Sequence, residues 1–311
     1  MPQHAKTTAS RTPVPAAAVA AASSASTATD SSTVAVVPAP TTLPDSPTRT
    51  KPRPVTLSEQ PHQATRVALL TGASSGIGEA IAHRLSEEED LRLLLSGRDR
   101  VRLRRAARGT NGVVLPVDLA APGGSERLAR LALHTAGRVD LLVAAAGIGW
   151  CGPFDTMPIP SIDQVLSVDL TAAMRLVRQL LPQMIARRRG NIVLIGSMIG
   201  QAPLAYEAVY AAANAGLAAF AESLRFELTG SGVKVTQVAL GPVDTAFFEH
   251  RGIPYQHTRP RPIPASRAAN AVVRAMLRGR DEVSIPRWAG LPRRLRGASP
   301  GIYRRLVTRF S

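Results

Sequence analysis

The chain has 311 residues, of which 45% are hydrophobic, so it can bury a sizeable core in one or at most about two domains. Its single cysteine, Cys151, excludes an internal disulfide framework and a cysteine-cluster metal site, and we expect no metal ligand. The net charge of +16 is concentrated in residues 251–311, which hold 14 basic and 2 acidic groups. This distribution excludes a uniformly basic nucleic-acid-binding body and predicts a near-neutral domain with a basic C-terminal segment.

The first 65 residues are dominated by alanine, serine, threonine, proline and valine, without a hydrophobic period. Such a segment cannot bury enough apolar surface to offset its ordering entropy, so residues 1–65 are predicted to be a disordered extension. The alanine-rich run at 16–22 is only weakly apolar, which argues against a signal peptide. No other stretch approaches the length of a membrane span, and we expect a cytoplasmic protein.

From Arg66 onward, short apolar runs alternate with helical patterns. Strands are expected at residues 67–70, 91–95, 113–117, 141–144, 192–195 and 233–238, with a last short strand at 283–285. Helices are expected from a glycine turn to Leu85 and at residues 99–107, 124–136, 161–187, 206–229 and 266–279. Continuous apolar strands that alternate with helices indicate a parallel sheet covered on both faces. We predict an α/β fold: one Rossmann-type, doubly wound parallel sheet over residues 66–285.

The first strand runs into a turn with three glycines. Glycine permits a tight exit from the strand and lets the backbone approach a pyrophosphate, whose charge suits the N-terminus of the following helix. The turn is the first strand-to-helix turn of the predicted sheet, which is where a dinucleotide binds in such folds. A turn with a purely structural role is the alternative. The contacts predicted from this turn are Gly72, Ser74, Ser75, Gly76, Ile77 and Gly78.

Four further motifs follow strand ends: Asp118-Leu119, Ala144-Ala145-Ala146-Gly147, Ile195-Gly196-Ser197 and Gly241-Pro242-Val243-Asp244-Thr245. Ser197 lies thirteen residues before Tyr210. With the Thr-Gly-x-x-x-Gly-x-Gly turn, these motifs resemble the short-chain dehydrogenase/reductase family over about residues 66–285, with alanines in place of both asparagines of its Asn-Asn-Ala-Gly motif. The resemblance implies an oxidoreductase that binds a nicotinamide dinucleotide, with further contacts at Asp118, Leu119, Ala145, Ala146, Gly147, Asn214, Gly241, Val243 and Thr245.

The end of the second strand bears on which dinucleotide binds. An acidic residue there suits the ribose diol of NAD(H), whereas an arginine suits the 2′-phosphate of NADP(H). This chain has Ser96-Gly97-Arg98 at that point, and Asp99 is expected to cap the next helix. The planar, permanently charged fork of Arg98 favours NADP(H) over NAD(H), although Arg98 as an ordinary surface arginine is the alternative.

The resemblance implies hydride transfer between the nicotinamide and a carbonyl or alcohol carbon. It implies that Ser197 orients the substrate oxygen and that Tyr210 transfers the proton. The family's lysine position is Asn214, and its asparagine position is Asp169. Losing a cation and gaining a carboxyl both raise the pKa of Tyr210, so we expect slow NADPH-dependent carbonyl reduction. The alternative is a weakened or inactive family member that acts as a dinucleotide-binding regulatory module.

Substrate pockets in such sheets lie outside the C-terminal ends of the strands. There we expect an apolar wall for a hydrophobic carbonyl or alcohol, although its members could instead be core or dimer contacts. The proline-rich segment 244–262 is predicted to be a lid over this pocket. The expected pocket residues are Trp150, Met198, Leu204, Phe247 and Phe248.

Beyond residue 285, arginines are interleaved with apolar side chains. Residues 286–311 are therefore predicted to form a basic amphipathic segment that either lies on an anionic membrane surface or docks on its own domain or a sister subunit. No recognition motif accompanies the charge, so we expect no nucleic-acid partner. The resemblance implies a homodimer or homotetramer through the helices at 161–187 and 206–229.

Overall fold

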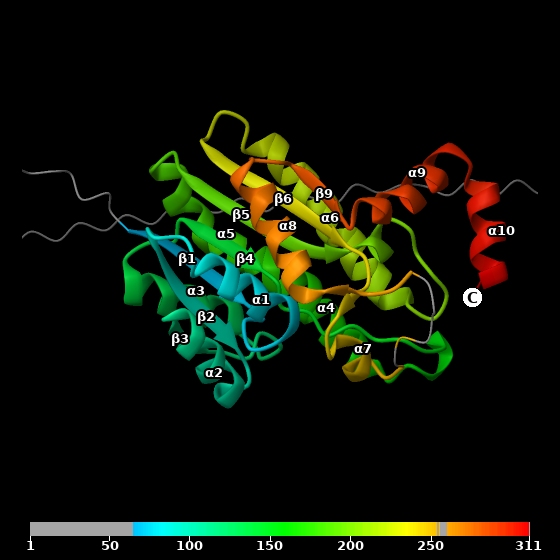
Figure 1. The fold of residues 1–311 in the computed structure, drawn as a ribbon, viewed down its shortest axis with the longest axis horizontal. Helices are drawn as coiled ribbons and strands as arrows, with labels where there is room; N and C mark the ends of the chain where they lie inside the picture. The colour runs from blue at the N-terminus through cyan, green and yellow to red at the C-terminus, as the bar shows by residue number, and fades with distance from the viewer. Residues whose placement is uncertain (1–64, 254, 256–259, 311) are drawn as a thin grey trace, which may run out of the picture. The chain divides into compact units, whose positions relative to one another are not determined.

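The structure is a computed structural model that describes residues 65–310 except 254 and 256–259. The predicted N-terminal extension therefore lies outside the described residues, apart from Thr65. So does the middle of the predicted lid segment. The described chain alternates strands and helices along its length (Figure 1).

Seven parallel strands form the central sheet, in the order β3-β2-β1-β4-β5-β6-β9. The predicted strands are all present, and the chain order reverses direction between β1 and β4, as in a doubly wound sheet. A separate pair joins β7 (Val243–Asp244) to β8 (Ile263–Pro264). The central strands are β1 (Arg66–Thr71), β2 (Leu91–Gly97), β3 (Val113–Pro116), β4 (Leu141–Ala144), β5 (Gly190–Ser197), β6 (Val233–Leu240) and β9 (Glu282–Ile285).

Helices cover both faces of this sheet because successive strand residues point to opposite sides. Leu69 packs in one core with side chains of α3 and α5, whereas Leu70 packs in a second core with side chains of α1 and α8. The fold is therefore the predicted Rossmann-type parallel sheet. The helices are α1 (Gly76–Leu85), α2 (Arg100–Thr110), α3 (Gly124–Ala136), α4 (Ile159–Leu166), α5 (Ala172–Ala186), α6 (Ala208–Glu227), α7 (Phe247–His250) and α8 (Ala265–Leu277).

Two long helices differ in detail from their predicted form. The helix expected at 161–187 is interrupted by a π-helical turn, Ser167–Thr171, between α4 and α5. Such turns carry one extra residue and often occur at functional sites. The helix expected from residue 206 begins at Ala208, because Tyr206 adopts a left-handed backbone with φ of 66° and Glu207 takes the N-cap position.

The C-terminal segment forms the turn η4 (Arg287–Gly290) and the helices α9 (Leu291–Ala298) and α10 (Pro300–Phe310). The Tyr303 hydroxyl donates a hydrogen bond to the Pro203 carbonyl at 2.5 Å, and Arg296 donates to the Gln201 carbonyl at 2.9 Å. These contacts favour the docked alternative for this segment. No helix in the described part of the chain is long and apolar enough to cross a membrane.

Candidate active site

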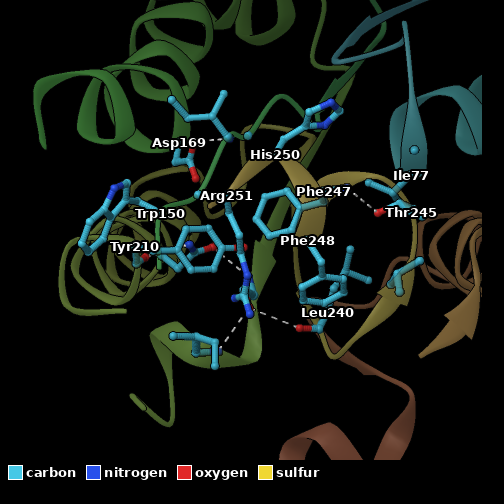
Figure 2. A pocket seen from close by; sticks show the side chains of 18 of the residues that line it. Ile77, Trp150, Asp169, Tyr210, Leu240, Thr245, Phe247, Phe248, His250 and Arg251 are labelled. Atoms are coloured by element: carbon cyan, nitrogen blue, oxygen red, sulfur yellow. Dashed lines mark hydrogen bonds between the residues drawn. The ribbon is translucent and has the colours of Figure 1, made fainter. Parts of the chain in front are cut away.

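A cavity of about 1330 Å³ lies at the C-terminal ends of the central strands. It is lined by every residue that the sequence assigned to a site, with the exception of Gly78. Figure 2 shows Trp150, Asp169 and Tyr210 on one side of this cavity, and Ile77 and Thr245 on the other. The topology therefore brings the predicted dinucleotide, proton-transfer and substrate residues to one continuous space.

The glycine turn has a geometry that only glycine fits. Gly72 has φ of 68°, and a Cβ on it would lie 2.7 Å from the Ala145 carbonyl oxygen. A Cβ on Gly78 would lie 2.2 Å from the Gly72 carbonyl oxygen, so Gly78 acts by close packing rather than by lining the cavity. Ser75, the N-cap of α1, makes no side-chain capping bond. The first-turn N–H groups of α1 are thus placed to receive a phosphate, and the turn fits a dinucleotide.

Thr71 joins the turn to the loop after β4. Its hydroxyl oxygen accepts hydrogen bonds from the backbone N–H groups of Ala145 and Ala146, both at 3.1 Å. Of the two alanines that replace the family's asparagines, Ala144 and Ala145, the second is therefore still bound through its backbone N–H. A single hydroxyl thus ties the loop after β4 to the end of β1, where the two strands pair.

Two guanidinium groups line the cavity just beyond the end of β2. Arg98 follows the strand and is exposed, and Arg102, which sequence analysis did not select, lies in the first turn of α2. Asp99 is the N-cap of α2, as predicted: its carboxylate accepts from the N–H groups of Val101 at 2.9 Å and Arg102 at 3.0 Å. The Oδ1 of Asp99 is thus engaged at the helix N-terminus, and its Oδ2 pairs with Arg102 at 3.3 Å. Asp118, after β3, is likewise held locally by the Ala120 N–H.

Asn214 stands in α6 one turn after Tyr210, and both ends of its carboxamide are engaged. Its oxygen accepts from the Ser197 N–H at 2.7 Å, and its nitrogen donates to the Tyr210 carbonyl at 2.9 Å. The side chain therefore ties the end of β5 to α6. In this way Asn214 fixes Ser197 and Tyr210 relative to each other, without the cation that the family's lysine supplies.

Asp169 lies in the π-helical turn and is buried. Its carboxylate accepts from the Ile148 N–H at 2.9 Å. Burial raises the pKa of Asp169 from its ordinary 3.8 to about 7, and hydrogen bonds from the Ile148 and Gly149 backbone offset part of that rise. Asp169 thus changes charge near neutral pH.

The replacement of the family's lysine by Asn214 and of its asparagine by Asp169 affects the pKa of Tyr210. Burial, and then the nearby Asp169, raise the pKa of Tyr210 well above its ordinary value, while a hydrogen bond with Ser197 lowers it only in part. The hydroxyl is therefore neutral across ordinary working pH. A neutral phenol can donate a proton but cannot serve as a base.

Aromatic rings cover the side of the cavity where sequence analysis predicts the substrate pocket. The Tyr210 and Phe247 ring centroids lie 5.6 Å apart, and those of Phe247 and Phe248 lie 5.7 Å apart. Trp150 and Met198 are half-buried, whereas Leu204 is 40% exposed at the rim. Four further lining residues come from the docked C-terminal segment, which sequence analysis had not joined to the site: Trp288, Pro292, Leu306 and Val307.

A buried ion pair in the cavity wall also escaped sequence analysis. Arg251 pairs with Glu207, and the two side chains are 9% and 8% exposed. The Arg251 guanidinium also lies 4.8 Å from the Phe248 ring centroid. Arg251 is one of many arginines in the chain, and no local pattern distinguishes it, so only the tertiary structure identifies it.

Comparisons with known proteins agree with this architecture. An uncharacterized oxidoreductase of Myxococcus xanthus is 33% identical over 240 residues, which cover 76% of this chain and 93% of that protein. The ketoacyl reductase HetN of a Nostoc species is 33% identical over 226 residues, covering 71% and 78%. A solved short-chain dehydrogenase from Sphingobium yanoikuyae in complex with NADPH matches with a TM-score of 0.67 and 28% identity, over 76% of this chain and 94% of that one.

A family model described as short chain dehydrogenase matches residues 66–254, well over half of the chain. Its span runs from the first residue of β1 through the glycine turn, Ser197 and Tyr210 to the segment after α7. The chain is therefore an oxidoreductase of the short-chain dehydrogenase/reductase family.

Proposed function

We propose that the protein is an NADP(H)-dependent reductase of a hydrophobic carbonyl compound. The observation that carries this proposal is the single cavity that holds Ser197 and Tyr210 beneath an aromatic wall and places Arg98 and Arg102 at its other end. Two guanidinium forks suit a 2′-phosphate. An apolar wall with two hydroxyl groups suits an apolar molecule that carries one polar oxygen.

In the proposed reaction the dinucleotide supplies the hydride when bound. The glycine turn and the open N-terminus of α1 would hold its pyrophosphate. Ser197 donates a hydrogen bond to the substrate oxygen, and Tyr210 donates the proton that this oxygen gains as the carbonyl is reduced. The raised pKa of Tyr210 keeps that proton in place until the oxygen becomes basic. Alcohol oxidation would need Tyr210 as an anion, so reduction is the favoured direction.

Two relatives support the cofactor and the reaction class. The Sphingobium yanoikuyae enzyme was solved with NADPH, and HetN is described as a ketoacyl reductase. For NADP(H) over NAD(H), the test is the Kd of each reduced cofactor in Arg98→Ala and Arg102→Ala. We expect each variant to weaken NADPH at least about tenfold and to leave NADH nearly unchanged, since a charge-assisted contact to phosphate is worth about 1.5–3 kcal/mol. Equal loss for both cofactors would contradict the preference.

Turnover is tested by NADPH oxidation with a panel of apolar ketones and aldehydes. We expect slow turnover in the parent that is lost in Tyr210→Phe, with NADPH binding retained. An Asn214→Lys variant would place a cation near the phenol, but it would also break the two bonds that Asn214 makes. We expect it to be faster than the parent on at least one carbonyl; no gain on any of them would refute the pKa reasoning.

The second candidate is a dinucleotide-binding regulatory module. It is favoured by Asn214, whose carboxamide is engaged with backbone groups, and by the raised pKa of Tyr210. NADPH binding without turnover, unchanged in Tyr210→Phe, would establish this alternative over the reductase.

We also propose a homo-oligomer through the helices at 161–187 and 206–229. Supporting it, Met174, Ile185 and Phe226 are exposed on α5 and α6. A Phe226→Glu variant that keeps the parent's molar mass in light scattering would argue against this face.

A peripheral membrane contact through residues 286–311 is a separate proposal. It draws support from exposed Leu291 and Ile302, which are accompanied by exposed positive charge such as Arg304. Flotation with anionic vesicles, with neutral vesicles as control, tests it. Failure to float with either lipid would refute it.

A further inference from the structure

Three loops meet on the substrate side of the cavity, at the point where α6 begins. The Cys151 N–H donates to the Arg251 carbonyl at 3.1 Å, and the Gly152 N–H donates to the Tyr206 carbonyl at 2.8 Å. The loop after β4, the loop before α6 and the segment after α7 are thereby joined. Tyr210 lies in the first turn of the helix that starts from this junction.

The side chains of Glu207 and Arg251 close the junction. Their ion pair is buried, and both residues line the cavity together with Tyr210. Arg251 also donates to the Ile253 carbonyl at 3.3 Å and stacks on Phe248. A buried ion pair contributes little to stability on balance, because desolvation offsets its attraction. Because the pair shares the cavity wall with Tyr210 and acts electrostatically on its hydroxyl, a functional role accounts for its presence better than stability does.

We propose that Arg251 is a positioning residue of the reductase, held by Glu207 so that the aromatic wall packs against Tyr210 while its positive charge is neutralised. This inference rests on the proposed function. Among the described residues of the cavity wall, Arg251 is the arginine at the Tyr210 end, since Arg98 and Arg102 belong to the β2 end. Figure 2 shows Arg251 running beside Tyr210, with Phe247 and Phe248 next to it.

The charges that face Tyr210 come from several elements. Burial has the largest effect on its pKa and raises it; Asp169 in the π-helical turn and Glu207 before α6 raise it further, whereas the Ser197 hydroxyl on β5 and, more weakly, Arg251 after α7 lower it. His250 and Cys151 line the same cavity. Arg251 is thus the one cation among these influences, although it is the weakest of them, and Glu207 acts on the phenol in the opposite direction.

Neutralising each partner alone tests this role, because the two changes should act in opposite directions. Glu207→Gln leaves the arginine charge uncompensated, which favours tyrosinate. Arg251→Gln removes that charge and leaves the carboxylate, which disfavours tyrosinate. A pKa lower by one unit gives about tenfold more tyrosinate at a given pH. Because Glu207 and Arg251 are the two weakest of these influences, we expect less than a one-unit change in that pKa, so kcat/KM for alcohol oxidation at pH 9 should rise about threefold in Glu207→Gln and fall about threefold in Arg251→Gln.

If the ion pair had only a structural role, both single variants should lose activity instead of changing it in opposite directions. The reversed pair, Glu207→Arg with Arg251→Glu, controls for folding. If positioning matters, the double variant should recover the KM that Arg251→Glu alone raises. Equal losses in both single variants, with no recovery in the reversed pair, would overturn the proposal.

A readout that needs no turnover separates this inference from the proposed function. The chain has four tyrosines, so the ¹³Cζ resonance of Tyr210 can be assigned in labelled protein with Tyr210→Phe as reference. We expect its ionisation to begin at a lower pH in Glu207→Gln than in the parent, and not in Arg251→Gln. If no carbonyl is reduced but this pattern holds, the reductase fails and the charge role of Arg251 stands. If the onset in Glu207→Gln is unchanged, the charge role fails whatever the activity.

Discussion

The buried carboxyl of Asp169 makes a quantitative prediction about stability. The side chain is 7% exposed, and its pKa is raised to about 7 from 3.8, chiefly by burial. An Asp169→Asn variant removes the charge but keeps an oxygen that can accept the Ile148 N–H. The substitution therefore removes the charge while it nearly preserves the shape of the side chain and its hydrogen bond.

The sign follows from the direction of this pKa. A carboxyl whose pKa is higher in the folded state than in the unfolded state favours folding at low pH, and that contribution is lost as pH rises from about 4 through about 7. At one pKa unit per 1.36 kcal/mol, the full difference is about 4 kcal/mol. About 2.5 kcal/mol of it develops between pH 5 and pH 8 by the same linkage. The Asp169→Asn variant does not lose this stability as the pH rises. Its free energy of unfolding, relative to that of the parent, should therefore increase with pH.

Urea unfolding of the full chain at pH 5 and pH 8 measures this difference, with the fluorescence of Trp150 and Trp288 as the signal. Asp163→Asn, which removes an exposed carboxyl from α4, is the matched control and should show no comparable growth with pH. A difference between parent and Asp169→Asn that is the same at both pH values would refute the reasoning.

Three further predictions concern the strand ends and turns around the cavity. Thr71→Val should lower the free energy of unfolding by about 2–4 kcal/mol in urea, because two backbone N–H groups lose their acceptor; Thr71→Ser should lose much less. Asp99→Ala should lose about 1 kcal/mol with the α2 cap, and Asp99→Asn should retain most of it. Gly78→Ala should weaken NADPH binding in a fluorescence titration, because its Cβ would strike the Gly72 carbonyl, whereas Gly297→Ala, where a Cβ meets nothing within 4 Å, should not.

The sheet and the glycine turn were predictable because they depend on local pattern. A strand buried on both faces must be apolar at consecutive positions, as in Val67 to Leu70, and each such run in the sequence became a strand. The glycines of the turn were predictable for the same reason, because a local backbone conformation or a close backbone approach requires each of them. Parallel connectivity then placed all the strand ends at one edge, and so placed the site.

What escaped prediction depends on contacts between distant segments. The Glu207–Arg251 pair spans forty-four residues. Trp288, Leu306 and Val307 belong to a C-terminal segment that Arg293 helps to fix on the domain, and that Tyr303 and Arg296 fix through partners far away in the sequence. The left-handed Tyr206 and the π-helical turn have no signal in hydrophobic periodicity. The role of Asn214 was half predicted: the missing charge is visible in the sequence, but the bonds to Ser197 and to the Tyr210 backbone are not.

The departures at Asp169 and Asn214 also predict how the proposed reduction depends on pH. Below about pH 7 Asp169 is neutral, and above it a carboxylate faces Tyr210 and makes the phenol a weaker acid. Proton donation to the substrate oxygen should then slow, so kcat/KM for carbonyl reduction should fall as pH rises through about 7. In Asp169→Asn this fall should disappear, because no charge develops beside the phenol. Initial rates of NADPH oxidation from pH 5.5 to 8.5, with cofactor saturating, measure both profiles. Identical profiles in parent and variant would mean that the proton of Tyr210 does not sense Asp169.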